Sequence, residues 1–294
     1  MLSKQEISME NNFTGYRRVF YSMASQLGYT LIFSKNINDT RAIKYGNEIK
    51  KYINPKGNIV FRDGSDSIEL CGEIGLISRI GNNLTIAIQK TNDSNKLLFI
   101  IRDELQEKHI VFSIPDVAEN NSNISVSVPK KVGTGRRDYN TMEIKFVNGK
   151  CEVLSNKNYE GKESKVEYSV NEYIEQIEKF LIGSVKLQDA EALKDGFELI
   201  KPVIEFQISS YLINGNLLRQ ANLESKYNSK REKCISKLEF LYSDENKDES
   251  KIEKIKKQIR ELDEEYYSNM EALKEQIEYL YEVYDNVLEK QKTA

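Results

Sequence analysis

The last third of the chain repeats apolar residues with the period of a coiled coil. The repeat comprises Ile252, Ile255, Ile259, Leu262, Tyr266, Met270, Leu273, Ile277, Leu280, Tyr284 and Val287. Its steps average about 3.5 residues, the spacing at which one helix keeps a continuous apolar seam against another. Two consecutive four-residue steps leave two options open. Either Met270 enters the seam through a local stutter, or a strict heptad places Asn269 there.

The segment before this repeat supplies a partner helix. A polar, turn-like stretch covers 243–249, and Ser250 with Glu253 has the spacing of a helix-capping box. Facing residues of an antiparallel pair have a constant index sum. That sum is 493 or 494 for Leu241–Ile252, Leu238–Ile255, Cys234–Ile259, Tyr227–Tyr266, Leu223–Met270, Ala221–Leu273, Leu217–Ile277, Ile213–Leu280 and Phe206–Val287. The sequence therefore predicts an antiparallel coiled-coil hairpin of helices 202–243 and 250–290.

The apolar stripe of this hairpin changes width along its length. It is one seam wide near the turn, whereas residues 203–212 and 280–288 are apolar on several faces. A helix that is apolar on several faces is buried by more than one neighbour. We therefore expect the base of the hairpin to pack on the rest of the protein and the tip to project into solvent. Such an arm is either a structural spacer or dimerisation element, or a specific recognition arm.

Five residues midway along the arm are candidate contacts with a partner. Arg231 stands opposite Leu262, and its alkyl stem can cover the leucine while its charged head reaches water. Tyr227 faces Tyr266, and Tyr267 follows directly. Tyrosine is enriched at protein interfaces, so these residues predict an interaction site on the arm.

The chain ahead of the hairpin changes its hydrophobic period twice. Apolar residues fall at helical spacing over 12–27 and again over 39–53, with a short apolar strand at 29–33 between them. From about 58 to 168 the period is two, which predicts seven to nine mostly antiparallel strands.

The helical period returns after the strands. A helix is expected at about 170–183, ended by Gly183-Ser184, and another at 186–200. Pro202 suits the first turn of a new helix, where its missing N–H costs nothing. We therefore expect the first helix of the hairpin to start at this proline.

The expected fold class is α+β with two domains. Residues 1–168 form a mixed α/β domain with a mainly antiparallel sheet, and residues 169–294 form a helical domain that ends in the long hairpin. The net charge is only −3, so no global field draws the protein to nucleic acid or anionic lipid. Three scattered cysteines and the lack of an apolar run of about 20 residues favour a cytoplasmic protein without membrane contact. The abundance of Lys, Ile, Asn and Tyr is typical of AT-rich genomes, as in some bacteria, phages and plasmids.

One acidic cluster is a candidate metal site. Asp63, Asp66 and Glu69 lie on or beside a predicted strand, and carboxylates so placed can bind Mg²⁺ and activate water. Glu73 follows them. The alternative is turn chemistry, because Asp63-Gly64-Ser65-Asp66 is also a good turn sequence with a solvated face.

One basic cluster is a candidate phosphate grip. Lys130, Lys131, Arg136 and Arg137 surround a glycine-containing loop, so side chains and backbone amides could together contact a nucleic-acid backbone. The alternative is a solvated hairpin loop. The loop lacks the lysine-serine pair and the strand–loop–helix order of a nucleotide-binding P-loop.

The remaining chemistry-bearing residues form no known catalytic pattern. His109 is the one histidine, and neither a nucleophile elbow, a dinucleotide fingerprint nor a zinc spacing is present, so no cofactor is expected. The favoured hypothesis is a non-enzymatic adaptor or complex subunit that uses the arm for protein–protein interaction or self-association. The alternative is a nucleic-acid-binding or metal-dependent nucleic-acid-processing protein that uses the loop 130–137 and the acids of 63–73.

Overall fold

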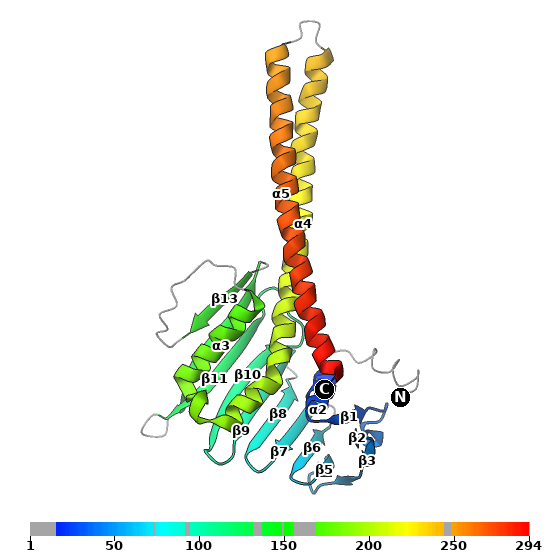
Figure 1. Ribbon diagram of the computed structural model, residues 1–294, viewed down its shortest axis with the longest axis vertical. Coiled ribbons are helices and arrows are strands. Elements are labelled where there is room, and N and C mark those ends of the chain that lie inside the picture. Colours follow the sequence, from blue (N-terminus) through cyan, green and yellow to red (C-terminus); the bar gives the residue numbers. More distant parts are fainter. Residues whose placement is uncertain are drawn as a thin grey trace.

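The computed structural model describes residues 16–72, 74–91, 95–131, 137–148, 150–155, 169–243 and 248–293. They form a mixed α/β body from which a two-helix arm projects, so the predicted α+β class is confirmed (Figure 1). In chain order the elements are α2 (Tyr16–Gln26), β1 (Tyr29–Ile32), the short helix η1 (Ile37–Asp39), β2 (Arg41–Lys44), β3 (Asn47–Ile49), β4 (Lys51–Ile53), β5 (Ile59–Asp63), β6 (Asp66–Cys71), β7 (Gly75–Ile80), β8 (Leu84–Lys90), β9 (Lys96–Asp103), β10 (Lys108–Pro115), β11 (Asn123–Lys131), β12 (Arg137–Val147), β13 (Lys150–Ser155), α3 (Val170–Val185), the short helix η2 (Leu187–Asp189), α4 (Glu191–Ser243) and α5 (Glu249–Thr293).

The body is built on one ten-stranded antiparallel sheet. Strands β4 to β13 lie in sequence order, so each pairs with its neighbours in the chain. Nine of these described strands lie after residue 58, as the two-residue period predicts. Alternate side chains face one side and form buried rows across the strands. One such row is Ile88, Phe99, Phe112, Val126 and Met142, each opposite the next and at most 2% exposed.

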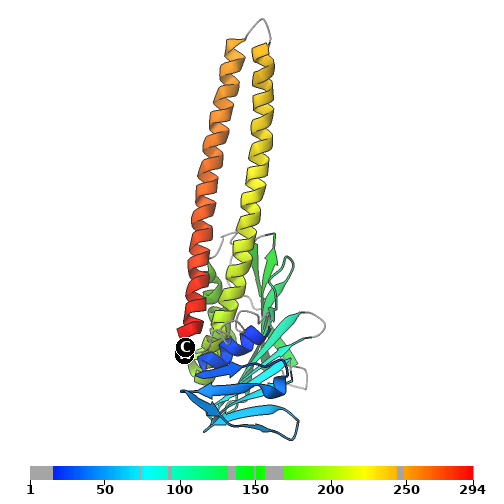
Figure 2. The same ribbon diagram turned by 90° about the vertical axis from the view of Figure 1, so that its right-hand side faces the viewer.

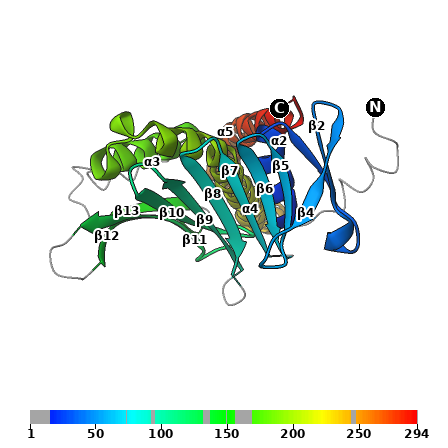
Figure 3. The same cartoon turned by 90° about the horizontal axis from the view of Figure 1, so that it is seen from below.

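Helices α3 and α4 cover one face of this sheet (Figure 3). Phe197 of α4 stacks on Phe112 with ring centroids 5.9 Å apart, and Tyr211 stacks on Phe146 at 4.5 Å. Gly196 lets α4 approach closely, because a Cβ at this position would lie 2.3 Å from Cγ2 of Ile101. Residues on both sides of the predicted 168/169 boundary thus share one core.

The predicted helix at 39–53 is wrong. This segment forms β2, β3 and β4, and β1 to β3 make a small second sheet beside α2. The isoleucines at 43, 49 and 53 have helical spacing, but Tyr45 and Gly46 adopt positive φ angles of 52° and 78°. Two such residues in succession close the tight β2–β3 turn, which joins Lys44 to Asn47.

Both predicted helix breaks are also wrong. Helix α3 continues through Gly183-Ser184 to Val185, and Lys186 ends it in the left-handed conformation. Helix α4 begins at Glu191 and passes through Pro202 without interruption. An interior proline removes one backbone hydrogen bond and costs roughly 3 kcal/mol. Here Ile200, Val203 and Ile204 flank it and are at most 5% exposed, so burial against the body offsets that cost.

The arm is the antiparallel hairpin predicted from the sequence. Helices α4 and α5 run side by side along its length, and the chain turns at the far end (Figure 2). At about 1.5 Å per residue, the 45 residues of α5 span roughly 68 Å. The start of α5 differs from the prediction, because Asp248 rather than Ser250 caps it. The backbone N–H of Lys251 donates to Asp248 Oδ1 at 3.1 Å.

The seam follows the stutter rather than the strict heptad. Met270 is partly buried in the hairpin, whereas Asn269 is exposed and donates to the Glu265 carbonyl at 2.8 Å. Below this point the predicted α4 partners are wrong. Ala221 and Leu217 are exposed, and Asn216 takes the inward position at 7% exposure. Within the described residues no helix is long and apolar enough to cross a membrane.

Candidate interaction site on the helical arm

The middle of the arm holds a cluster of polar and aromatic contacts between α4 and α5. The rings of Tyr227 and Tyr266 stack with centroids 4.0 Å apart and planes inclined by 13°. The Tyr227 hydroxyl donates to Asp263 Oδ1 at 2.6 Å, and Arg231 Nε lies 3.3 Å from the same oxygen. The hydrogen bond to Asp263 raises the pKa of Tyr227 to about 12. These contacts fix the register of the two helices.

This geometry divides the five predicted interaction residues into two groups. Tyr227, Arg231, Leu262 and Tyr266 are half-buried between the helices, where they hold the arm together. Tyr267 is 65% exposed, with its ring edge-on to Tyr266 at 5.4 Å. Of the five, Tyr267 is therefore the one that presents most surface to a partner. Their role in binding stays a prediction.

The tip of the arm exposes a large aromatic side chain. Phe240 is 72% exposed, and Tyr242 two residues later is 49% exposed. Phe240 borders a shallow groove lined by Ser236, Lys237, Phe240, Leu241 and Ile255. The sequence hypothesis missed Phe240 because it is the residue just before Leu241, which belongs to the seam. The available signal was an aromatic residue outside the apolar period in a polar segment.

The predicted metal-binding acids are divided between two places. Lys44 Nζ lies 3.0 Å from Asp63 Oδ2 and 3.4 Å from Asp66 Oδ2, with only 6% of its side chain exposed. Burial lowers the pKa of Lys44, but its hydrogen bonds and charge pairing with Asp63 outweigh burial and leave the pKa raised. A lysine ammonium thus holds the position between the two carboxylates that a cation would take.

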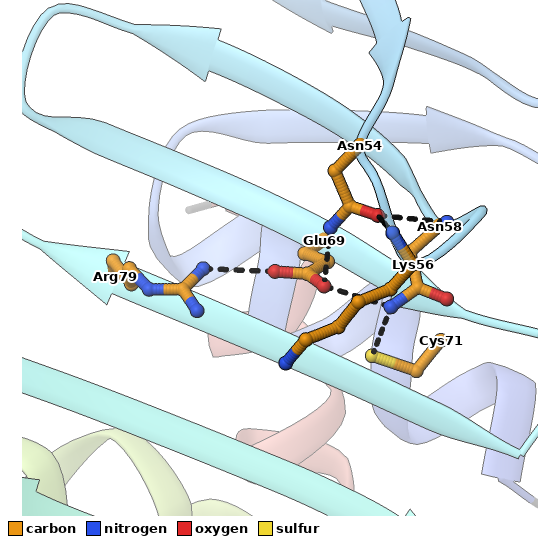
Figure 4. Close-up of polar contacts among 6 residues, drawn as sticks. All are labelled: Asn54, Lys56, Asn58, Glu69, Cys71 and Arg79. Atoms are coloured by element: carbon orange, nitrogen blue, oxygen red, sulfur yellow. Dashed lines mark hydrogen bonds and ion pairs between the residues drawn. The ribbon is translucent and has the colours of Figure 1, made fainter.

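Glu69 sits in a separate polar cluster on the other face of the sheet (Figure 4). It accepts hydrogen bonds from Asn54 at 2.9 Å and Asn58 at 2.8 Å, and forms an ion pair with Arg79 at 3.0 Å. Burial raises its pKa, but the bonds from Asn58, Arg79 and Asn54 outweigh burial and lower it. Across the described ranges no three His, Cys, Asp or Glu side chains are grouped to hold a metal ion. Glu73 lies outside those ranges.

The predicted basic loop is described only at its margins. Lys130 is exposed at the end of β11, where it pairs with Asp138, and Lys131 pairs with Arg137 in the same ladder. Arg136 lies outside the described residues. His109 stands in β10 opposite Arg102. The structure thus places Lys131 and Arg137 side by side, while nucleic-acid binding by the loop stays a prediction.

The sheet face opposite α3 and α4 is the second large surface of the body (Figure 3). Ile77, Ala87, Ile100 and Val111 stand opposite one another on four neighbouring strands and point to this face. Ile100 is 37% exposed, and the other three are partly buried. An apolar row on an uncovered sheet face is typical of a surface that another molecule covers.

No known family model, curated protein or solved structure matches this chain. Its function therefore has to be argued from the geometry of its own residues.

Proposed function

We infer that this protein is a non-enzymatic adaptor or complex subunit whose arm carries a protein-binding surface. The observation that carries this proposal is the exposed Phe240 at the far end of a two-helix arm. A spacer needs a seam between its helices but no aromatic residue outside it. Phenylalanine buried at an interface contributes roughly 1.5–3 kcal/mol, so an exposed one at the tip favours recognition.

An adaptor also needs a second surface, and the body supplies a candidate. The row Ile77, Ala87, Ile100 and Val111 lies on the sheet face that α3 and α4 leave open. Because α4 is one continuous helix from the sheet to the tip, the arm is rigidly attached to the body. A partner on the sheet and a partner on the arm would therefore be held at a fixed separation.

The test compares Phe240→Ala with a matched control on the body. Leu105 is 76% exposed in the turn after β9, so Leu105→Ala removes an equally exposed apolar side chain away from the arm. The full-length proteins are compared by size-exclusion chromatography with light scattering and by purification from the native host. We expect Phe240→Ala to weaken the complex on the order of tenfold, and Leu105→Ala to leave it unchanged.

Two outcomes would overturn the proposal. One is a wild-type protein that stays monomeric and retains no partner. The other is a complex that Phe240→Ala leaves as stable as before. Circular dichroism of both variants excludes loss of helix as the cause of any change.

A further inference from the structure

The arm has opposite net charges at its two ends. Its outer part, residues 230–243 and 248–260, carries nine Lys and Arg against five acids, a net of +4. The inner part of α5, residues 261–286, carries nine acids against Lys274 alone, a net of −8. The facing part of α4, residues 206–229, adds only +1 from Arg219, Lys226 and Glu224. The arm is therefore basic at the tip and acidic at the base.

The hairpin cannot neutralise this asymmetry by itself. Its two helices are antiparallel and joined at the tip, so the tip of α4 faces the tip of α5 and base faces base. A basic tip meets an acidic base only when a second arm lies alongside in the opposite direction. Complementary charges of this kind set the orientation and register of two partners.

The exposed apolar residues have the same symmetry. Height along the arm can be numbered by the α5 residue, because Tyr227 stacks on Tyr266 and these indices sum to 493. On this scale the exposed Tyr242 and Phe240 lie near 251 and 253, and Leu218 lies near 275. On α5 the exposed apolar residues are Tyr267, Tyr279 and Tyr281.

We propose that a second copy of this chain binds along the arm in antiparallel orientation, with the basic tip of each arm on the acidic base of the other. A two-fold axis near height 266 brings Phe240 and Tyr242 of one copy to the level of Tyr279 and Tyr281 of the other. The two Tyr267 side chains then lie beside the axis. This inference rests on the proposed function, because it names the partner of the same arm.

The available length is sufficient for a stable dimer. Heights 251 to 281 span about 45 Å at 1.5 Å per residue, and two helices side by side present a strip roughly 20 Å wide. The product is roughly 900 Å² on each copy, against about 800 Å² per partner in a standard protein interface. The bodies lie at opposite ends of such a dimer.

Charge reversal provides the test. Lys254 and Lys256 are exposed near the tip, and Glu275 and Glu278 are exposed at the matching heights of the base. One variant carries Lys254→Glu and Lys256→Glu, and the other carries Glu275→Lys and Glu278→Lys. Each alone would place like charges opposite each other at both ends of the dimer, so its dissociation constant should rise by on the order of tenfold or more.

The decisive sample is an equimolar mixture of the two variants. In the mixture each reversed end meets a complementary partner, so a one-to-one heterodimer should form with about the stability of the wild-type dimer. Analytical ultracentrifugation of full-length proteins at low and high salt measures all four samples. The inference fails when wild type is monomeric at about 100 µM, when neither variant dissociates more readily, or when the mixture stays monomeric. A monomer that still binds a different protein through Phe240 would refute this inference and leave the proposed function intact.

Discussion

Gly196 is the residue at which the attachment of the arm to the body is most sensitive to a single methyl group. A Cβ at this position would lie 2.3 Å from Cγ2 of Ile101 and 3.1 Å from Cδ1 of Leu84, and both side chains are buried. Overpacking of a core costs about 1–3 kcal/mol. Alanine in place of glycine inside a helix gains about 0.5–1 kcal/mol. Packing therefore outweighs helix propensity, and we expect Gly196→Ala to destabilise the protein by roughly 1–2 kcal/mol.

A double-mutant cycle separates the two effects. Ile101→Leu removes the branch that carries Cγ2 with little change in volume, so Gly196→Ala should cost about 1 kcal/mol less in that background. Ile101→Val keeps Cγ2 and should give no such relief, which makes it the matched control. The measurement is urea denaturation followed by circular dichroism. A Gly196→Ala protein more stable than wild type would refute the close packing of α4 on the sheet.

Three further predictions concern the polar clusters and the nucleic-acid alternative. The pKa of Tyr227 is raised to about 12, so its hydrogen bond stabilises the arm fully below pH 10 and loses this contribution as pH rises through 12; thermal melts of Tyr227→Phe should lack that part of the pH dependence. The lowered pKa of Glu69 means that its stabilising contribution is present above its ordinary pKa and is lost as pH falls through the lowered value. Arg79→Ala should reduce that contribution and destabilise the protein by about 1–3 kcal/mol at neutral pH, and acid titrations of both proteins would detect it; equal stability would contradict the role of the ion pair. In a gel shift with a DNA duplex at low salt we expect no retardation, and salt-sensitive binding lost in a Lys130→Ala, Arg136→Ala protein would instead support the nucleic-acid alternative.

The sequence predicts the outer half of the arm well because one interaction dominates there. From Leu241 to Leu223 each helix has only the other to pack against, so the apolar period decides which side faces inward. Below this point α4 also contacts the sheet, and two neighbours compete for its apolar residues. Leu217 is left 42% exposed as a result, while Asn216 turns inward. Periodicity alone cannot reveal that competition.

The candidate sites show the same limit. Spacing correctly groups Tyr227 with Tyr266, because both lie on the seam. It fails for Glu69, since two of its partners, Asn54 and Asn58, come from a turn that folds over the strand. It also fails for Asp63 and Asp66, because their cation, Lys44, belongs to the small sheet. Contacts between separate elements depend on tertiary packing, which leaves no pattern in the local sequence.

The stutter in α5 links the internal packing of the arm to its outer surface. A strict heptad after Tyr266 would bury Asn269 and then Gln276, whereas both are exposed and Ile277 is 8% exposed. The inserted step rotates the lower part of the helix by about one residue, or roughly 100°. That rotation decides which residues of the base point outward, Tyr279 and Tyr281 among them. The surface on which a second arm is proposed to bind therefore depends on a seam residue, Met270, that such a partner would not itself need to touch.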